Sequence, residues 1–390
     1  MPSVPSRIHW GLPPWEIDYT PPPHELPPSA DFAVVGGGFT GLAAAGWVRL
    51  LEPRKSVAVL EAASIGSGAS GRTGGAILAE TAAGDLPSLG DVLSGFQRIL
   101  DDLGRACDFP LAEQCDIALD GAYELGRSAG RTDSPIAWND SGTLRVVNEV
   151  PGGTVDPGKL VAGLARAAVK LGAAVIENAR VERVDWASGA ELHLGRGRLR
   201  AGKVLFATNA LSLPLSGLAT ATHPMLALAA LAAPVSDRVL GAIGLRERKP
   251  FYTVDFPYLW GRVRRDNSVL WGAGLVEPPE SGNLAEIEIA APEPERIFGL
   301  LEKRVRGMHS ALAETRFTHR WAGPLLFRHA WRPVFGHHPA SREGIILGAY
   351  AGHGVAQSVY LGAWAAEALL GRRDLPDWGQ PKAGESFSWP

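Results

Sequence analysis

Residues 31–61 hold two short apolar runs separated by a glycine-rich turn and a longer apolar stretch. The run at 32–35 leads into the turn at 36–41, and alanine- and leucine-rich sequence follows to about residue 51. A second run, 56–60, ends at the carboxylate of Glu61. Short β-prone runs bounded by glycine indicate strands, and the longer stretch is typical of a buried helix. The pattern therefore predicts a strand, a tight turn, a helix and a second strand.

The turn has the spacing G-x-G-x-x-G. Gly36 makes the tight turn, Gly38 lets the backbone approach a pyrophosphate, and Gly41 allows helix and strand to pack closely. The N-terminus of the following helix favours the negative charge of phosphates. Glu61 follows Gly41 by twenty residues and can accept hydrogen bonds from a ribose diol. We therefore predict a bound dinucleotide; the alternative is a plain strand–helix turn.

A second loop of small residues comes directly after Glu61. Residues 62–75 read Ala-Ala-Ser-Ile-Gly-Ser-Gly-Ala-Ser-Gly-Arg-Thr-Gly-Gly. The loop joins two apolar segments and lacks the length and charge of a disordered linker. Its small side chains predict that the backbone lies close to something flat or charged.

Later segments predict the rest of this unit. Asp156 and Pro157 form an N-cap and first-turn pair for a helix over 158–171. Apolar runs then predict strands at 174–177, 204–210 and 345–347, and a closing helix at about 355–370. The chain leaves the unit after Asn209 and returns near Gly344, which predicts an inserted second unit.

These motifs resemble the D-amino-acid-oxidase-like family of FAD-dependent amine and amino-acid oxidoreductases, in the branch with γ-glutamylputrescine oxidoreductase, glycine oxidase and sarcosine oxidase. The resemblance also includes residues 153–157, 320–323 and 352–355, and it spans most of 31–371. It implies an α/β fold in which a Rossmann-like FAD-binding domain is interleaved with a mixed or antiparallel-sheet substrate domain. The implied boundaries are a proline-rich arm at 1–30, the FAD domain at 31–105, 150–210 and 335–375, the substrate domain at 106–149 and 211–334, and a tail at 376–390.

The resemblance also assigns residues to the cofactor. The implied FAD contacts are Gly36, Gly38, Phe39, Thr40, Gly41, Glu61, Ala62, Ser70, Gly71, Arg72, Thr73, Gly74, Gly75, Val181, Ala207, Asn209, Gly352, His353, Gly354, Val355 and Ala356. The helix N-terminus near Val355 would stabilise negative charge on the reduced flavin. His353 is expected beside the flavin; the alternative is a helix-capping histidine.

Two departures from the family pattern change the expectations for cofactor attachment, for the substrate and for the use of oxygen. Sarcosine oxidases attach FAD through a cysteine, and counting places that position at Gly323, far from Cys107 and Cys115. We therefore expect non-covalent FAD and two reduced core cysteines. The carboxylate-binding and oxygen-activating lysines of those enzymes fall at Ala356 and near Leu270. We accordingly expect neither sarcosine as the substrate nor rapid use of oxygen.

The inserted unit contains a readable β-hairpin. Alternation places Tyr258, Trp260 and Arg262 on one face, and a two-residue turn sets Arg262 opposite Trp271. Arg262 could then hold a substrate carboxylate in a bidentate fork, or it could stack on Trp271 as structural cation–π packing. Tyr252 and Tyr258 are further candidates for substrate contact, with core aromatics as the alternative. The candidate catalytic set consists of Arg262, Tyr258, Tyr252, His353 and Trp271.

Composition and charge limit the partners and the cell compartment that we expect. A net charge of −3 over 390 residues does not favour a nucleic-acid partner, and no run reaches the ~18 apolar residues of a membrane span. The first residues lack the basic and apolar segments of a signal peptide, so we expect a cytoplasmic protein. No spacing predicts a metal site, and the oligomeric state is not indicated.

We therefore predict an FAD enzyme that oxidises the C–N bond of an amine or amino acid. Hydride would pass to the flavin, the imine would hydrolyse, and oxygen would accept the electrons and give hydrogen peroxide. One alternative is a dehydrogenase with a quinone or protein acceptor. A second is a flavin-bearing, non-catalytic subunit of a larger assembly. The segment 144–153 is shorter than in the family, which would admit larger substrates.

Overall fold

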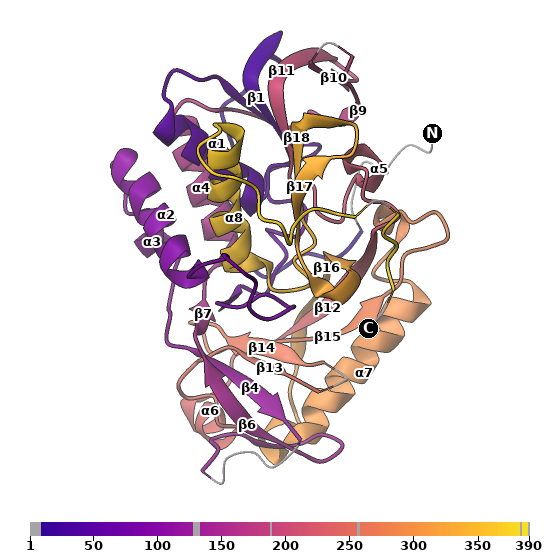
Figure 1. The fold of residues 1–390 in the computed structure, drawn as a ribbon. Coiled ribbons are helices and arrows are strands. Elements are labelled where there is room, and N and C mark those ends of the chain that lie inside the picture. Colours follow the sequence, from indigo (N-terminus) through magenta and orange to yellow (C-terminus); the bar gives the residue numbers. More distant parts are fainter. Residues whose placement is uncertain (1–8, 128–132, 188, 256–257, 383, 389–390) are drawn as a thin grey trace.

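Two large sheets make up the molecule, and helices cover one face of the first (Figure 1). The computed structural model describes residues 9–127, 133–187, 189–255, 258–382 and 384–388. Each large sheet has eight strands, and a small sheet pairs two more. Within the described residues, no helix has the length and apolar character needed to cross a bilayer.

The first sheet carries the predicted nucleotide unit and confirms the α/β class. Five strands run parallel in the order β18-β11-β1-β2-β8, with β17 antiparallel beside β18 and β10 antiparallel beside β11. The predicted strands are present, but β11 begins at Gly197 and ends at Phe206, so residues 207–210 of the predicted strand 204–210 lie beyond it. The strands are β1 (Ser29–Val35), β2 (Val57–Leu60), β8 (Ala174–Ile176), β9 (Val181–Asp185), β10 (Ala190–Leu194), β11 (Gly197–Phe206), β17 (Val334–His338) and β18 (Ser341–Gly348).

The helices on this sheet begin where the sequence predicts. The mostly buried α1 (Phe39–Leu51) packs against α4 (Pro157–Lys170) and α8 (Gly354–Leu369). Asp156 caps α4 by accepting a hydrogen bond from the Lys159 amide at 3.0 Å. Outside them lie α2 (Val92–Ala106) and α3 (Leu111–Gln114). Cys107 and Cys115 are free and buried in the core below this sheet, as predicted.

The second sheet is built largely from the inserted segments, in the order β16-β12-β15-β14-β13-β4-β6-β5. Helix α7 (Pro292–Met308) packs against β15 and β12. Short helices α5 (Leu213–Ser216) and α6 (Asp237–Ala242) lie in the connections. The strands are β4 (Ala122–Gly126), β5 (Ala137–Asn139), β6 (Thr143–Val150), β12 (Thr222–Ala232), β13 (Phe251–Thr253), β14 (Trp260–Val263), β15 (Val269–Val276) and β16 (Phe317–Arg328), and the small sheet pairs β3 (Ala76–Leu78) with β7 (Gly152–Thr154).

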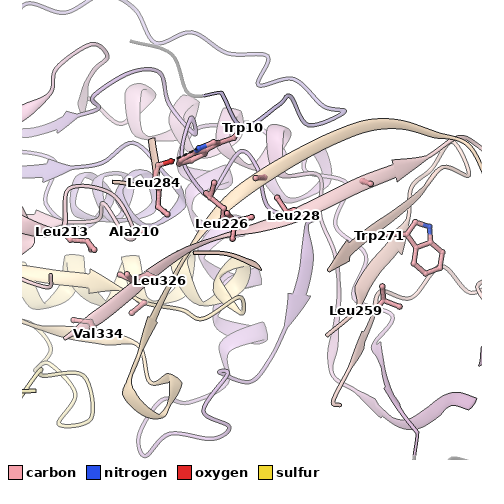
Figure 2. Close-up of a cluster of buried hydrophobic side chains, with 14 of the residues drawn as sticks. Trp10, Ala210, Leu213, Leu226, Leu228, Leu259, Trp271, Leu284, Leu326 and Val334 are labelled. Carbon is pink, nitrogen blue, oxygen red and sulfur yellow. Dashed lines mark hydrogen bonds between the residues drawn. The ribbon is translucent and has the colours of Figure 1, made fainter. Parts of the chain in front are cut away.

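The predicted register of the hairpin β14–β15 is wrong by one residue. Arg262 pairs with Leu270, and Trp271 pairs with Gly261. The loop has three residues rather than two, because Asn267 adopts a left-handed φ of 64° and the Arg264 amide bonds the Ser268 carbonyl. A shift of one residue moves side chains to the other face of a sheet. Trp271 therefore lies in the core (Figure 2). Its ring centroid is 5.4 Å from that of Trp138.

The described part of the proline-rich arm lies on the molecule through its tryptophans. Trp10 is fully buried, and its Nε1 donates to the Leu284 carbonyl at 3.1 Å (Figure 2). Trp15 Nε1 donates to the Gly71 carbonyl at 2.8 Å, and its ring packs edge-on against Trp321. The arm thus ties the second glycine-rich loop to β16.

Candidate functional site

A cavity of about 620 Å³ lies between the two sheets and is lined by residues from both. On the first sheet it follows the carboxyl ends of β1, β2 and β11, which is where open α/β sheets bind ligands. On the second sheet it follows one face of β12, β13 and β14. The cavity therefore continues from the glycine-rich turn to the inserted unit.

The first turn forms a cradle with no room for side chains. A Cβ at Gly41 would lie 2.0 Å from the Gly36 carbonyl oxygen, and a Cβ at Gly38 would lie 2.7 Å from Ser70 Oγ. Ser70 Oγ accepts a hydrogen bond from the Phe39 amide at 2.9 Å. Gly38 is the N-cap of α1 and offers no side-chain cap, so the first turn of the helix is open to an anionic group.

Glu61 lies at the end of β2 beside this cradle. Its carboxylate accepts the Gly37 amide at 2.8 Å and the Ala63 amide at 2.9 Å. Burial raises the pKa of Glu61, and the two amide hydrogen bonds oppose that shift. Ribose hydroxyls would add donors to a carboxylate that is already held in place, so the geometry fits the predicted dinucleotide.

The second loop folds back under the cradle. The Gly66 amide bonds the Gly37 carbonyl at 2.9 Å, and a Cβ at Gly74 would lie 2.3 Å from the Trp260 ring. Arg72 is directed away from the phosphate end: its Nη1 donates to the carbonyls of Gly11 at 2.9 Å and Ala322 at 3.1 Å. Burial lowers the pKa of Arg72 to about 10. Its side chain therefore supports the loop through the N-terminal arm and β16.

The C-terminal signature closes the other side of the cavity. Gly352 has a φ of 92°, and α8 begins two residues later. Asn209 Oδ1 accepts the Ala349 amide at 2.9 Å, which fixes the turn after β18 against the turn after β11. Burial lowers the pKa of His353, so its imidazole is neutral near pH 7. Its ring centroid lies 6.3 Å from that of Tyr252.

Most of the residues assigned to the cofactor line this cavity. Those residues are Gly36, Gly38, Phe39, Thr40, Glu61, Ala62, Ser70, Arg72, Thr73, Gly74, Val181, Ala207, Asn209, Gly352, His353, Gly354 and Val355. Gly41, Gly71, Gly75 and Ala356 lie outside the lining, with Ala356 in the core of α8.

The candidate catalytic set divides into two groups. Tyr252, Tyr258 and His353 line the cavity. Arg262 and Trp271 do not, because the corrected register buries Trp271 and because the Arg262 guanidinium lies behind the glycine loop, where Nε donates to the Gly74 carbonyl. Neither the carboxylate clamp nor the stacking of Arg262 on Trp271 fits this placement. Arg262 positions the loop instead.

The sequence reasoning missed two acidic residues of the cavity, Glu80 and Glu124. Pairing across β4, β13 and β14 sets Glu124 beside Tyr252 and Tyr252 beside Trp260, so the three side chains form one row. Glu80 follows β3 and reaches the same row from the side. The polar residue within the short apolar run 122–126 was a weak signal for Glu124. Nothing in the local sequence indicated Glu80.

A glycine-rich phosphate cradle with a ribose acid, facing an antiparallel sheet across one cavity, defines a dinucleotide-binding protein of the two-domain oxidoreductase class. The family model described as FAD dependent oxidoreductase matches residues 31–368. The chain therefore belongs to that family, and FAD is its cofactor. Because a side chain would fill the cradle at Gly38 and because Glu61 is prepared for a ribose, the residues present fit this group.

Relatives and solved structures agree with the family match. Gamma-glutamylputrescine oxidoreductase of Escherichia coli (strain K12) is 26% identical over 385 residues, which cover 88% of this chain and 84% of that protein. A probable oxidoreductase, OrdL, of Rhizobium meliloti (strain 1021) is also 26% identical, with 88% and 83% covered. The structure of glycine oxidase from Geobacillus kaustophilus has a TM-score of 0.67 at 18% identity and covers 89% of this chain and 96% of its own, which shows a shared fold.

Proposed function

We propose that the protein oxidises a C–N bond of an amine or amino acid with FAD held non-covalently. The observation that supports this is a continuous cavity that joins the dinucleotide cradle to the aromatic and acidic side chains of the second sheet. The names of the relatives, gamma-glutamylputrescine oxidoreductase and glycine oxidase, belong to the same chemistry. When bound, FAD supplies the hydride acceptor and the electron carrier of such a reaction.

The residues of the chain would position the amine and keep the site dry. The aromatic side chains of Tyr258, Trp260 and Trp331 line the inserted-unit end of the cavity and limit access of water. The substrate nitrogen must be neutral before its lone pair can form a C=N bond, and the neutral imidazole of His353 adds no charge to the cavity wall. The carbon then loses hydride, and water converts the imine to a carbonyl compound and ammonia or a smaller amine.

The positions of the two cysteines support non-covalent attachment. Neither Cys107 nor Cys115 lines the cavity, and burial raises the pKa of Cys115 to about 12, so its thiol stays protonated. Acid precipitation of the purified yellow protein should leave FAD in the supernatant. Colour that stays with the precipitate would contradict non-covalent binding.

Anaerobic mixing with a panel of amines and amino acids tests the reaction. We expect at least one compound to bleach the flavin absorbance and to yield its carbonyl product. Admitting air then tests the acceptor: rapid return of colour with hydrogen peroxide supports oxygen, whereas slow return that a quinone accelerates supports a dehydrogenase. If no amine or amino acid bleaches the flavin, C–N oxidation is wrong and the non-catalytic flavin subunit is the better account.

A further inference from the structure

Two carboxylates share one tyrosine hydroxyl at the inserted-unit end of the cavity. The Tyr252 hydroxyl donates to Glu124 Oε1 at 2.6 Å and lies 3.2 Å from Glu80 Oε1. A hydroxyl has one hydrogen, so it can satisfy one carboxylate at a time. Burial and the nearby charges of Glu124 and Asp85 raise the pKa of Glu80. The group of Glu80, Glu124 and Tyr252, here called the acidic triad, therefore places two carboxyl groups at one hydroxyl that can satisfy only one of them, and a second negative charge on Glu80 is unfavourable unless a cation lies nearby.

Among the described residues, no lysine or arginine is paired with these carboxyl groups. Neither Glu80 nor Glu124 forms an ion pair with a lysine or arginine among residues whose positions are described. Of the arginines that line the cavity, Arg72 is bound to backbone carbonyls of the arm and of β16. Arg180 lies at the opposite end, next to Ala179, whose amide bonds the Glu61 carbonyl. The basic side chain of the described residues that does interact with the triad is His353, near Glu124, and burial lowers the pKa of that imidazole. A substrate carboxylate would therefore find no described lysine or arginine beside the triad.

The walls around the triad suit an alkyl chain that ends in a cation. Tyr252 and Trp260 are paired across β13 and β14, and Trp260 packs over Gly272, where a Cβ would lie 2.0 Å from its ring. Tyr258 and Trp331 lie further along, with ring centroids 6.2 Å apart. Aromatic faces attract ammonium groups and bury methylenes. Carboxylates and aromatic rings together favour an ammonium over a neutral group.

We propose that the acidic triad binds a second, non-reacting ammonium group, so that the substrate is a diamine-type cation rather than an α-amino acid. This rests on the proposed C–N oxidation. The reacting nitrogen has to be neutral when hydride leaves the carbon, and two carboxylates beside it would hold its proton. The triad therefore suits the nitrogen at the other end of the substrate, which keeps its charge throughout.

Binding to the dithionite-reduced FAD-loaded protein tests the inference without turnover. Matched sets of a monoamine, a diamine and an ω-amino acid of equal chain length, such as pentylamine, cadaverine and δ-aminovalerate, are titrated calorimetrically, and the comparison is repeated at chain lengths from three to six carbons. For at least one length we expect the diamine to bind ten-fold or more tightly than the monoamine, and the ω-amino acid to bind more weakly than either.

Isosteric variants identify the group responsible. Glu80→Gln and Glu124→Gln should each remove most of the diamine preference, while the dissociation constants of monoamines change by less than about three-fold. Tyr252→Phe should keep the preference, because both carboxylates remain. Glu314→Gln, at an exposed carboxylate outside the cavity, is the matched control and should behave as the parent. FAD stoichiometry, measured from absorbance, checks that each variant is folded.

The outcomes separate this inference from the proposed function. Equal binding of monoamines and diamines at every length, or a preference unchanged by both glutamine variants, would overturn the ammonium subsite even if amines bleach the flavin. A diamine preference that depends on Glu80 and Glu124, in a protein whose flavin no amine reduces, would support the subsite and refute C–N oxidation. Tightest binding of the ω-amino acid would also overturn the inference.

Discussion

Arg262 is a buried cation that supports the second glycine-rich loop, residues 62–75, from outside the cavity lining. Its side chain is 7% exposed, and Nε donates to the Gly74 carbonyl. Burial lowers the pKa of Arg262 to about 10, while the charge of Asp156 opposes that shift. A buried guanidinium is costly unless its donors are used, so the loop and Arg262 stabilise each other. The role of this residue is therefore structural.

Arg262→Met tests this role at the residue scale. Methionine fills much of the volume but leaves the Gly74 carbonyl without its donor, which costs roughly 1–3 kcal/mol. We expect chemical denaturation to show this loss of unfolding free energy, together with weaker FAD retention. Amine dissociation constants of the FAD-saturated variant should match those of the parent. A selective loss of carboxylate-bearing ligands with stability unchanged would instead support a substrate clamp.

Asp31, near the start of β1, contributes to the free energy of unfolding by an amount that depends on pH. Its carboxylate accepts hydrogen bonds from the Ser56 amide and hydroxyl at 2.8 Å and from Lys55 Nζ at 2.9 Å. These bonds, led by the Ser56 amide, lower the pKa of Asp31 to about 2. A lowered folded-state pKa means that the stabilisation is present above the unfolded value near 4 and is lost as pH falls toward 2.

Asp31→Asn should therefore lower the unfolding free energy at pH 7 and have little effect near pH 2. Because the side chain is partly exposed, solvent screening limits the loss to about 1 kcal/mol. Urea denaturation of the apoprotein at pH 7, 5 and 3 measures the difference, with Glu314→Gln as the surface control. A difference that is constant across this range would contradict the assigned hydrogen bonds.

At the scale of elements, local signals were enough for some parts of the fold and not for others. The unit β1–α1–β2 and the cap of α4 were predictable, because glycine spacing, an N-cap and apolar runs act within a few residues of each other. The hairpin strands were predictable too, but their register depended on the left-handed Asn267 in the loop. Glu124 reaches the site through parallel pairing of β4 with β13, where its partner Tyr252 is 128 residues away along the chain, and no local pattern encodes this pairing.

The N-terminal arm contacts parts of the molecule that are far from it in the sequence. Trp15 bonds Gly71 in the second glycine loop and packs on Trp321 of β16, while the arm carbonyl of Gly11 accepts from Arg72. Two of these contacts hold the loop that lies beneath the cradle, and the third joins the arm to β16. An extended segment without internal hydrogen bonds can do this at low cost, because its prolines already restrict the unfolded chain.

Trp15→Ala should therefore destabilise the second glycine-rich loop. Loss of a partly buried indole and its hydrogen bond is expected to cost roughly 2–3 kcal/mol of stability and to reduce FAD affinity by about ten-fold. Leu12→Ala is the matched control, since Leu12 is on the same arm with 77% of its surface exposed. Fluorescence titration of the apoproteins with FAD measures the FAD affinity of both variants. Equal losses in the two variants would show that the arm acts without these specific contacts.

Over the whole molecule, the cavity is the place where two otherwise separate cores meet. One core lies beneath the helices of the first sheet, and the other includes most of the second sheet and extends under the opposite face of the first. Residues of β12 such as Ala227 and Ala229 line the same cavity as Gly38 and Glu61. A ligand that fills this space would contact both sheets, so its binding energy should stabilise both at once.

Removal of FAD tests that coupling. A ligand that binds only the folded state at a thousand times its dissociation constant stabilises by about 4 kcal/mol. We expect one unfolding transition whose midpoint rises with FAD concentration. We also expect amide hydrogen exchange to slow in peptides of β1–α1 and equally in peptides that contain Ala227 and Ala229. Exchange that slows only around the cradle would show that the second sheet is not coupled to the cofactor, and its acidic wall would then have to bind substrate without help from FAD.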